Sequence, residues 1–284
     1  MKRALCALGL VIVTASLAGA EPPAGSHWKR QGETAQPELR LFHSTQAVAL
    51  PTAEVLNSGV MQFEISHRFF PPFSDGHDAF YGLDGPVNMR IGLGFAPTDR
   101  MVITLARSNV ADNVDLQARV QLLGHRSDAL PVLVAVQAGG AWNTAERSDR
   151  DRGDSRNFQL YVQGIINTMI RNRVALGAVP SFVSNSDINS VESENLTVLG
   201  LYAQVYLNRL LSVLAEWSPE LSGHAAPYAP AAFGIELETG GHFFKIIATN
   251  SVTLNPSQYL FGATDAFKAD NLRLGFVITR LLWL

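Results

Sequence analysis

The sequence has one cysteine and little charge. Cys6 is the single cysteine of the 284 residues, and it lies in an apolar N-terminal run. If that run is removed as a leader, the rest of the chain has no thiol for disulfides, thiolate nucleophiles, or Cys-based zinc and iron–sulfur sites. The net charge is −3, and no tract is rich in Lys and Arg. Nucleic acid is therefore not expected as a partner.

Charged residues make up 17% of the chain and hydrophobic residues 47%. The charged fraction lies below the roughly 25% that is usual for soluble domains. No segment after the first twenty residues has the roughly 18 consecutive apolar residues that a transmembrane helix needs. A membrane protein without such helices has to be a closed β-barrel, because only closure pairs every backbone N–H and C=O group in lipid.

Residues 1–20 have the pattern of a cleavable signal peptide. Lys2 and Arg3 precede the apolar run, and the small residues 18–20 precede Glu21. This order predicts export with cleavage after Ala20. Cys6 lies inside the run and not at its cleavage point, which argues against a lipid-anchored lipoprotein.

Period-two alternation of apolar with polar or small residues predicts about twelve strands of roughly ten residues each. It is clearest from Val87 to Phe95, where Asn88 and Arg90 fall on the polar side. The predicted strands are 60–68, 86–95, 100–107, 113–123, 130–142, 157–168, 173–184, 196–207, 210–217, 231–239, 242–249 and 271–282.

The connections between these strands alternate in length. Short ones at 96–99, 125–128, 171–172, 208–209 and 240–241 alternate with a medium one at 108–112 and with long ones at 69–85, 143–156, 185–195, 219–230 and 250–270. Short periplasmic turns and longer external loops are typical of outer-membrane barrels. The predicted fold is all-β, a single antiparallel transmembrane barrel with both termini in the periplasm. A soluble periplasmic β-sandwich or lipocalin-like barrel is the structural alternative.

The predicted organisation is a signal peptide at 1–20, an N-terminal periplasmic segment or plug at 21–58, and the barrel at 59–284. The middle segment is rich in Pro, Gly, Ala and polar residues. Disorder is expected up to about Gln36, and residues 39–50 are mildly strand-like. A tail, a lumen plug and an extra strand all fit this composition.

Several short motifs carry a family resemblance. They are ISHRF at 65–69, GLDG at 82–85, TDR at 98–100, HFF at 242–244 and TNS at 249–251. Together they resemble an uncharacterised family of bacterial outer-membrane β-barrels that carries a domain-of-unknown-function label. The resemblance spans nearly the whole mature chain, and it implies a barrel but no activity. The chain end at Leu281–Leu284 resembles the strand that the barrel-assembly machinery reads, although such strands usually finish on an aromatic residue.

Successive side chains of a strand point to opposite faces, and in the predicted strands this places side chains of both charges on the lumen face. The expected lumen-lining charges are Glu64, Arg68, Arg90, Asp115, Arg119, Glu236, Glu238, Lys245 and Arg273. Rings of charge are how pores select ions, and mixed signs favour neither pure anions nor pure cations. A ladder of ion pairs that closes a narrow barrel is the equally weighted alternative.

The sequence favours a porin-like small-solute channel of the bacterial outer membrane, with a small solute, outer-membrane lipid and the assembly machinery as partners. A non-conducting structural or adhesion barrel is the alternative. An outer-membrane enzyme and a soluble periplasmic β-protein are less favoured. No catalytic site is expected, because the Ser–His neighbours such as Ser66 and His67 are adjacent in sequence and not placed across strands. No metal or cofactor site is expected either, because the acidic residues around His77 match no EF-hand or zinc spacing.

Overall fold

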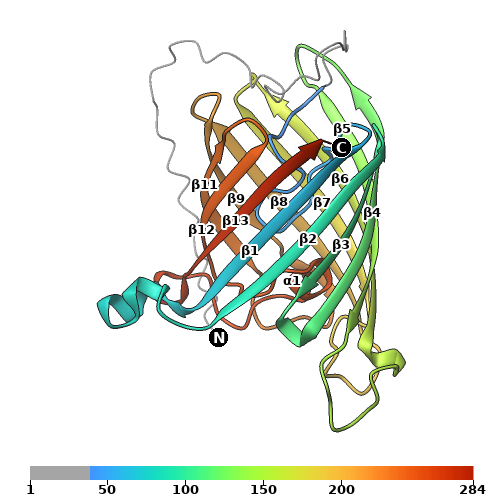
Figure 1. Ribbon diagram of the computed structural model, residues 1–284, viewed down its shortest axis with the longest axis vertical. Helices are drawn as coiled ribbons and strands as arrows, with labels where there is room; N and C mark the ends of the chain where they lie inside the picture. Colours follow the sequence, from blue (N-terminus) through green and yellow to red (C-terminus); the bar gives the residue numbers. More distant parts are fainter. Residues whose placement is uncertain (1–38, 284) are drawn as a thin grey trace, which may run out of the picture.

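The computed structural model describes residues 39–283, and these form one β-barrel with short helical turns (Figure 1). The predicted signal peptide and the stretch predicted to be disordered lie outside the described residues. The strands are β1 (Val60–Pro72), β2 (Val87–Thr98), β3 (Met101–Ser108), β4 (Asn113–His125), β5 (Val132–Asn143), β6 (Phe158–Ile170), β7 (Val174–Ser184), β8 (Asn195–Tyr206), β9 (Leu211–Trp217), β10 (Glu220–Gly223), β11 (Ala231–Glu238), β12 (His242–Thr249) and β13 (Arg273–Trp283). The helices are η1 (Phe73–Gly82), η2 (Val110–Asp112), η3 (Ser155–Asn157), α1 (Pro256–Phe261) and η4 (Ala269–Asn271).

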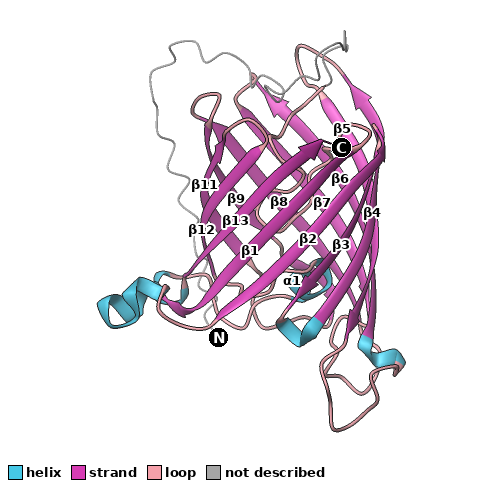
Figure 2. Cartoon of the chain, viewed as in Figure 1, coloured by secondary structure: helices cyan, strands magenta, loops and turns pink. Residues whose placement is uncertain are grey.

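The sheet closes on itself. Apart from β9 and β10, each strand pairs antiparallel with its neighbours in sequence, and β1 pairs with β13, with Ile65 opposite Ile278. Strand β9 pairs with β11, which follows β10 in the sequence. Strands β9 and β10 both pair with β8, at successive positions along it. They occupy a single place in the wall, interrupted at Ser218 and Pro219, where the proline has no N–H to donate. The wall therefore has twelve strand positions, and the predicted twelve-stranded antiparallel barrel is confirmed (Figure 2). The prediction missed β10, which lies in the expected 219–230 loop.

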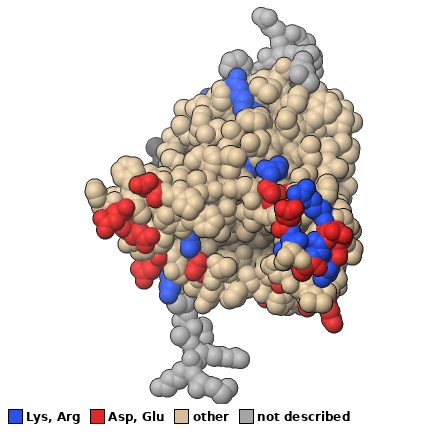
Figure 3. All heavy atoms as spheres, turned by 60° about the horizontal axis from the view of Figure 1, so that its bottom comes forward, with Lys and Arg blue, Asp and Glu red and all other residues tan. Residues whose placement is uncertain are grey.

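The two faces of the wall differ in polarity. On β4, Asp115 and Arg119 are buried, whereas Leu116 is 56% exposed to the outside. Large apolar side chains such as Ile246, 54% exposed, cover the outer surface. Figure 3 shows the visible charges gathered at the end of the barrel that bears the long connections, with few on the wall. An apolar exterior around a polar interior suits lipid, and it is the reverse of a soluble lipocalin-like barrel.

Short turns gather at one end of the barrel and the long connections at the other, with the short β3–β4 connection, residues 109–112, as the exception at the second end. The short turns lie at the end where β13 finishes, the upper end in Figure 1. Residues in the left-handed region make these turns, among them Arg171 and Asn172 between β6 and β7, and Gly240 and Gly241 between β11 and β12. At the other end, η1 projects sideways from the barrel. None of the helices within residues 39–283 is long and apolar enough to cross a membrane.

Two segments fill the lumen. Residues 39–58, termed the plug, run inside the barrel from the short-turn end, and side chains such as Phe42 and Leu50 are almost fully buried (Figure 1). Residues 250–272, termed the inward loop, fold α1 into the opposite end and bury Tyr259 and Leu260. Within the plug, a single isolated bridge joins Gln46 and Pro51, so this part of the chain is neither an extra wall strand nor a free tail.

Candidate functional site in the barrel lumen

The charged side chains of the lumen are unevenly distributed around the wall. Strands β5, β6, β7 and β8 contain no Asp, Glu, Lys or Arg, and their inward side chains are apolar, amide, hydroxyl or tyrosine. We term this part the apolar sector because it carries the largest buried apolar cluster of the lumen, although buried amides such as Gln163 and Asn167 lie on it as well. The buried charges lie on the remaining strands. Arginine predominates among them on β1 to β4, and glutamate on β9 and β11. In chain order, the buried charged residues of the strands are Glu64, Arg68, Arg90, Asp115, Arg119, Glu216, Glu236, Glu238 and Lys245.

Eight of the nine side chains predicted to line the lumen are buried, and the exception is Arg273. Arg273 lies where β13 begins, at the end with the long connections. Its guanidinium binds Asp265 at 2.9 Å and the carbonyl of Phe70 at 2.7 Å. Glu238 lies at the opposite end, where its carboxylate accepts the N–H of Gly240 at 2.9 Å. These two residues are therefore rim groups, and the other seven line the lumen between them.

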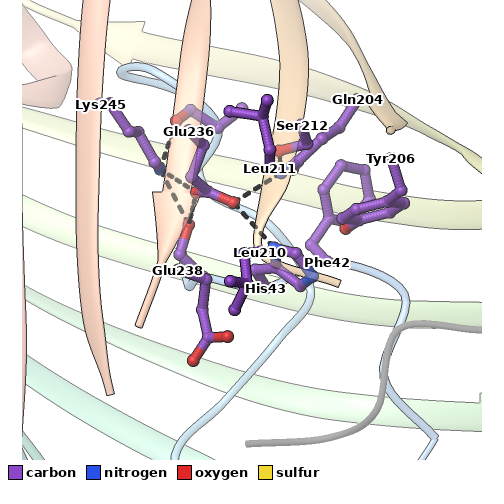
Figure 4. A network of polar contacts seen from close by, with 12 residues as sticks. Phe42, His43, Gln204, Tyr206, Leu210, Leu211, Ser212, Glu236, Glu238 and Lys245 are labelled. Atoms are coloured by element: carbon purple, nitrogen blue, oxygen red, sulfur yellow. Dashed lines mark hydrogen bonds and ion pairs between the residues drawn. The ribbon is translucent and has the colours of Figure 1, made fainter. Parts of the chain in front are cut away.

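Glu236 is fully buried and joins the wall to the plug (Figure 4). Its carboxylate forms an ion pair with Lys245 at 3.2 Å and accepts a hydrogen bond from Gln204 at 2.6 Å. From the plug, Ser44 donates to it at 3.1 Å and His43 Nδ1 lies 3.2 Å away. A buried carboxylate is tolerated when cations and donors surround it in this way.

The side chain of Glu216 binds backbone groups of the plug, residues 39–58, and none of its side chains. Its carboxylate accepts the N–H groups of three consecutive residues, Val48 at 2.9 Å, Ala49 at 3.0 Å and Leu50 at 3.2 Å. The side chain is only 3% exposed. Glu216 lies four residues after Ser212 on β9, so strand alternation places both side chains on the inner face. This alternation could have identified Glu216 from the sequence, but the prediction did not include it.

Plug carbonyls are bound by cationic side chains of the wall. Arg119 donates to the carbonyls of Thr45 at 2.6 Å and Glu54 at 3.0 Å, and its other nitrogens bind Gln137. Lys245 donates to the carbonyl of Ala47 at 2.6 Å. These hydrogen bonds to charged groups are stronger than neutral ones, and they do not depend on the plug side chains.

Two tyrosines of the wall lie flat across glycines of the neighbouring strand. A Cβ atom at Gly177 would lie 2.1 Å from the ring of Tyr202, and one at Gly139 would lie 2.3 Å from the hydroxyl oxygen of Tyr161. Because the glycines leave this space, the Tyr202 hydroxyl reaches the carbonyl of Pro51 at 2.9 Å. The hydroxyl of Tyr161 donates to Asp115 at 2.9 Å.

The apolar side chains of the plug pack on the apolar sector. Phe42, Leu50, Val179 and Tyr202 belong to one buried cluster. The rings of Phe42 and Tyr202 meet edge to face with centroids 5.2 Å apart. Leu50 lies over Gly200, where an added Cβ would come within 2.8 Å of the leucine methyl carbons. The plug thus presents apolar side chains to one part of the wall and its backbone to charged side chains.

A cavity of about 10 Å³ lies where the plug meets the inward loop. That volume is at the lower limit for one water molecule. Arg90 and Arg119 line it from the wall, together with Gln117 and Gln137. Arg90 also forms an ion pair with Glu64 and donates to Asn255 of the inward loop at 2.8 Å. Gln46 and Ala49 of the plug and Leu254 and Pro256 of the inward loop line the same cavity, so the two segments meet inside the lumen.

The charged side chains of the long connection between β5 and β6 bind groups within it and also the β7–β8 connection, where Arg150 donates to the carbonyl of Ile188. Arg150 donates to Asn157 at 2.7 Å, and Arg156 binds both carboxylate oxygens of Asp154. Hydrogen bonds from Arg156 lower the pKa of Asp154 to about 2. Across residues 39–283, His, Cys, Asp and Glu form no group of three that could hold a metal ion.

Comparison with known proteins identifies the family. Residues 42–282 match the family described as "Membrane bound beta barrel domain (DUF5777)". The chain belongs to this family. The predicted resemblance to an uncharacterised barrel family is thereby confirmed. The match begins at Phe42, so the DUF5777 domain includes most of the plug as well as the wall.

One solved structure of low sequence identity shows the same fold, and others are more distantly similar. An outer membrane channel from Pseudomonas putida F1 has a TM-score of 0.51 and 11% identity, over 81% of this chain and 98% of that one. The NanC porin has a TM-score of 0.46 and 9% identity, over 79% and 99%. Omp33 of Acinetobacter baumannii has a TM-score of 0.39 and 8% identity, over 80% and 100%. No curated protein matches. The DUF5777 chain is thus a membrane β-barrel that resembles outer-membrane porins and channels.

Proposed function

We propose that this DUF5777 protein is a small-solute channel of the bacterial outer membrane that its own plug holds closed. The observation that carries the proposal is the pairing of charged wall groups with the plug backbone. Glu216 accepts hydrogen bonds from the plug backbone, and Arg119 donates hydrogen bonds to plug carbonyls as well as to Gln137 of the wall. If the plug leaves, these groups line a polar lumen and bind water. Export by the signal peptide and insertion by the barrel-assembly machinery are part of this proposal.

A non-conducting barrel is the second candidate, and one observation favours it. Glu64 and Arg90 pair within the wall on adjacent strands, as in a ladder that closes the lumen from the wall alone. The ion pair of Lys245 and Glu236 also joins adjacent wall strands. Such pairs strengthen the wall whether or not the protein conducts.

A catalytic role is not proposed. Ser66 is buried on the inner face of β1, whereas the ring of His67 packs on Phe276 with centroids 4.4 Å apart. Adjacent residues of a strand point to opposite faces, so this histidine is not positioned to take a proton from the serine. The Ser–His pair that the sequence offers therefore does not form a nucleophile and base.

Conductance of the full chain in planar bilayers tests the proposal. The test variant is the double substitution Phe42→Ser and Leu50→Ser, which weakens the plug and leaves the wall intact. We expect brief, rare openings in the original protein and long openings in the variant. The control is Val191→Ser, at a loop position 82% exposed, which should behave like the original protein. Heat-modifiable migration on a gel reports that each barrel is folded.

Charge substitutions in the opened channel provide a second measurement. Arg119→Gln removes a lumen cation and should shift the reversal potential toward cation selectivity, whereas Arg273→Gln at the rim should shift it less. A folded double variant that carries no current would overturn the channel proposal and favour the non-conducting barrel.

A further inference from the structure

Side chains of the wall bind backbone groups along the plug, as a peptide-binding site does. This arrangement indicates which class of solute fits the proposed channel. We propose that the lumen admits short peptides with apolar side chains, which occupy the site that the plug occupies in the closed state. The proposal rests on the channel function proposed above and names the solute for that same lumen. The segment that fills the site is itself an apolar peptide, with the sequence LFHSTQAVAL at positions 41–50.

The first argument is that wall side chains bind backbone groups along the plug. Donors of the wall reach its carbonyls, and acceptors of the wall reach its N–H groups. The plug groups bound in this way are the carbonyls of Leu41, Thr45, Gln46, Ala47, Pro51, Ala53 and Glu54, and the N–H groups of Val48, Ala49, Leu50 and Ala53. Backbone recognition does not depend on side-chain identity, so other peptides can make the same hydrogen bonds.

The second argument is that charged side chains and the apolar sector occupy different parts of the wall. A short peptide has a carboxylate, an ammonium group and apolar side chains. Arg119 and Glu216, which lie on opposite sides of the apolar sector, suit the two charged ends. The apolar sector between them, where Leu50 rests over Gly200, suits the side chains. Burying those side chains contributes about 25 cal/mol per Å² of apolar area.

This wall fits other small solutes less well. A sugar would bind the buried amides of the apolar sector, but its hydroxyl groups would find no partners beside the apolar side chains of Val179, Leu196 and Val198, which costs free energy. An inorganic ion would use only the charged strands, and four wall strands without charge would serve no purpose for it. A peptide is the class of solute that uses both parts of the lumen.

Liposome swelling tests the inference. Vesicles carry the full chain with Phe42→Ser and Leu50→Ser, and they are exposed to the tripeptide Ala-Leu-Ala, to Ser-Gly-Ser, or to a disaccharide of similar mass. We expect Ala-Leu-Ala to enter several-fold faster than the disaccharide, with Ser-Gly-Ser between them. Adding Glu216→Gln should lower the ratio of the Ala-Leu-Ala rate to the disaccharide rate several-fold, because the carboxylate that suits the ammonium group is lost. The ratio is used because the same substitution also changes how often the channel opens. Adding Glu220→Gln, at an exposed position on β10, should leave that ratio unchanged.

A second measurement uses current. A synthetic peptide with the sequence of residues 41–50 should block the opened channel, and a version with serine at positions 41, 42 and 50 should block it at least tenfold less strongly. If the double variant does not fold, Leu50→Ser alone takes its place in both assays. Swelling rates ordered by mass alone, or equal block by the two peptides, would overturn the peptide inference and leave the channel proposal standing. A folded protein that admits no solute and carries no current would overturn both.

Discussion

Replacing Glu216 with alanine is the most direct test of how the plug is held. The carboxylate accepts the N–H groups of Val48, Ala49 and Leu50, and the side chain is 3% exposed. In the alanine variant, these three N–H groups lose their acceptor while the plug stays seated. When the plug leaves, water satisfies the same groups. The substitution therefore raises the free energy of the closed state more than that of the open state.

The magnitude follows from the cost of unsatisfied donors. Each buried donor without a partner costs about 1–3 kcal/mol. Water entering the space of the lost side chain relieves part of this cost, and removing a buried carboxylate returns some desolvation energy to the closed state. We therefore expect a net effect of about 2–4 kcal/mol on plug seating, which corresponds to about 30- to 1000-fold in the ratio of open to closed channels. Glu216→Gln keeps one acceptor oxygen and should fall between alanine and the original residue.

Open probability in planar bilayers measures this ratio directly. The series is the original protein, Glu216→Gln and Glu216→Ala, with Glu220→Gln as a charge-matched control at an exposed site. We expect the highest open probability for Glu216→Ala, an intermediate one for Glu216→Gln, and the same low value for the original protein and the control. An alanine variant that is heat-modifiable on a gel and yet opens no more often than the control would refute the reasoning. It would mean that the hydrogen bonds to Glu216 do not hold the plug.

Two further predictions concern the wall. Gly177→Ala places a Cβ 2.1 Å from the ring of Tyr202, so we expect it to lower barrel stability by about 1–3 kcal/mol, measured as a lower unfolding temperature on heat-modifiability gels. Gly153→Ala, in open space, is the control, and equal unfolding temperatures would contradict the packing argument. Ile166→Arg, on the outer face of β6, should cost about 2–4 kcal/mol in denaturant titrations in lipid vesicles. Val191→Arg, in an external loop, should cost little, and equal effects would show that β6 does not face lipid.

The wall could be predicted from the sequence because its pattern is local. Residues two apart share a face, so the alternation from Val87 to Phe95 gives both the strand and its inner side. Turn composition fixed the connections, as at Gly240 and Gly241. The β10 strand was missed because Pro219 interrupts the pattern between it and β9.

The occupied lumen could not be predicted in the same way, because its contacts are distant in sequence. Tyr202 lies 151 residues from its partner Pro51, and Lys245 lies 198 residues from Ala47. Parity can indicate that Lys245 faces inward, but no periodic pattern specifies the segment that meets it. A plug was one of three interpretations of residues 21–58, and the composition of that segment did not distinguish among them.

The two kinds of plug contact have different roles in opening. When the plug leaves, Glu216 and Arg119 exchange backbone partners for water, and a typical hydrogen bond contributes only about 0.5–1.5 kcal/mol in such an exchange. Exposing a buried Leu or Phe side chain costs about 1.5–3 kcal/mol, so Phe42 and Leu50 account for much of the preference for the closed state. The charged groups instead determine where the plug sits, because any displaced position leaves buried donors or acceptors unpaired. In the proposed channel, the wall groups that position the plug would also bind the solute that replaces it, which a purely structural barrel does not require.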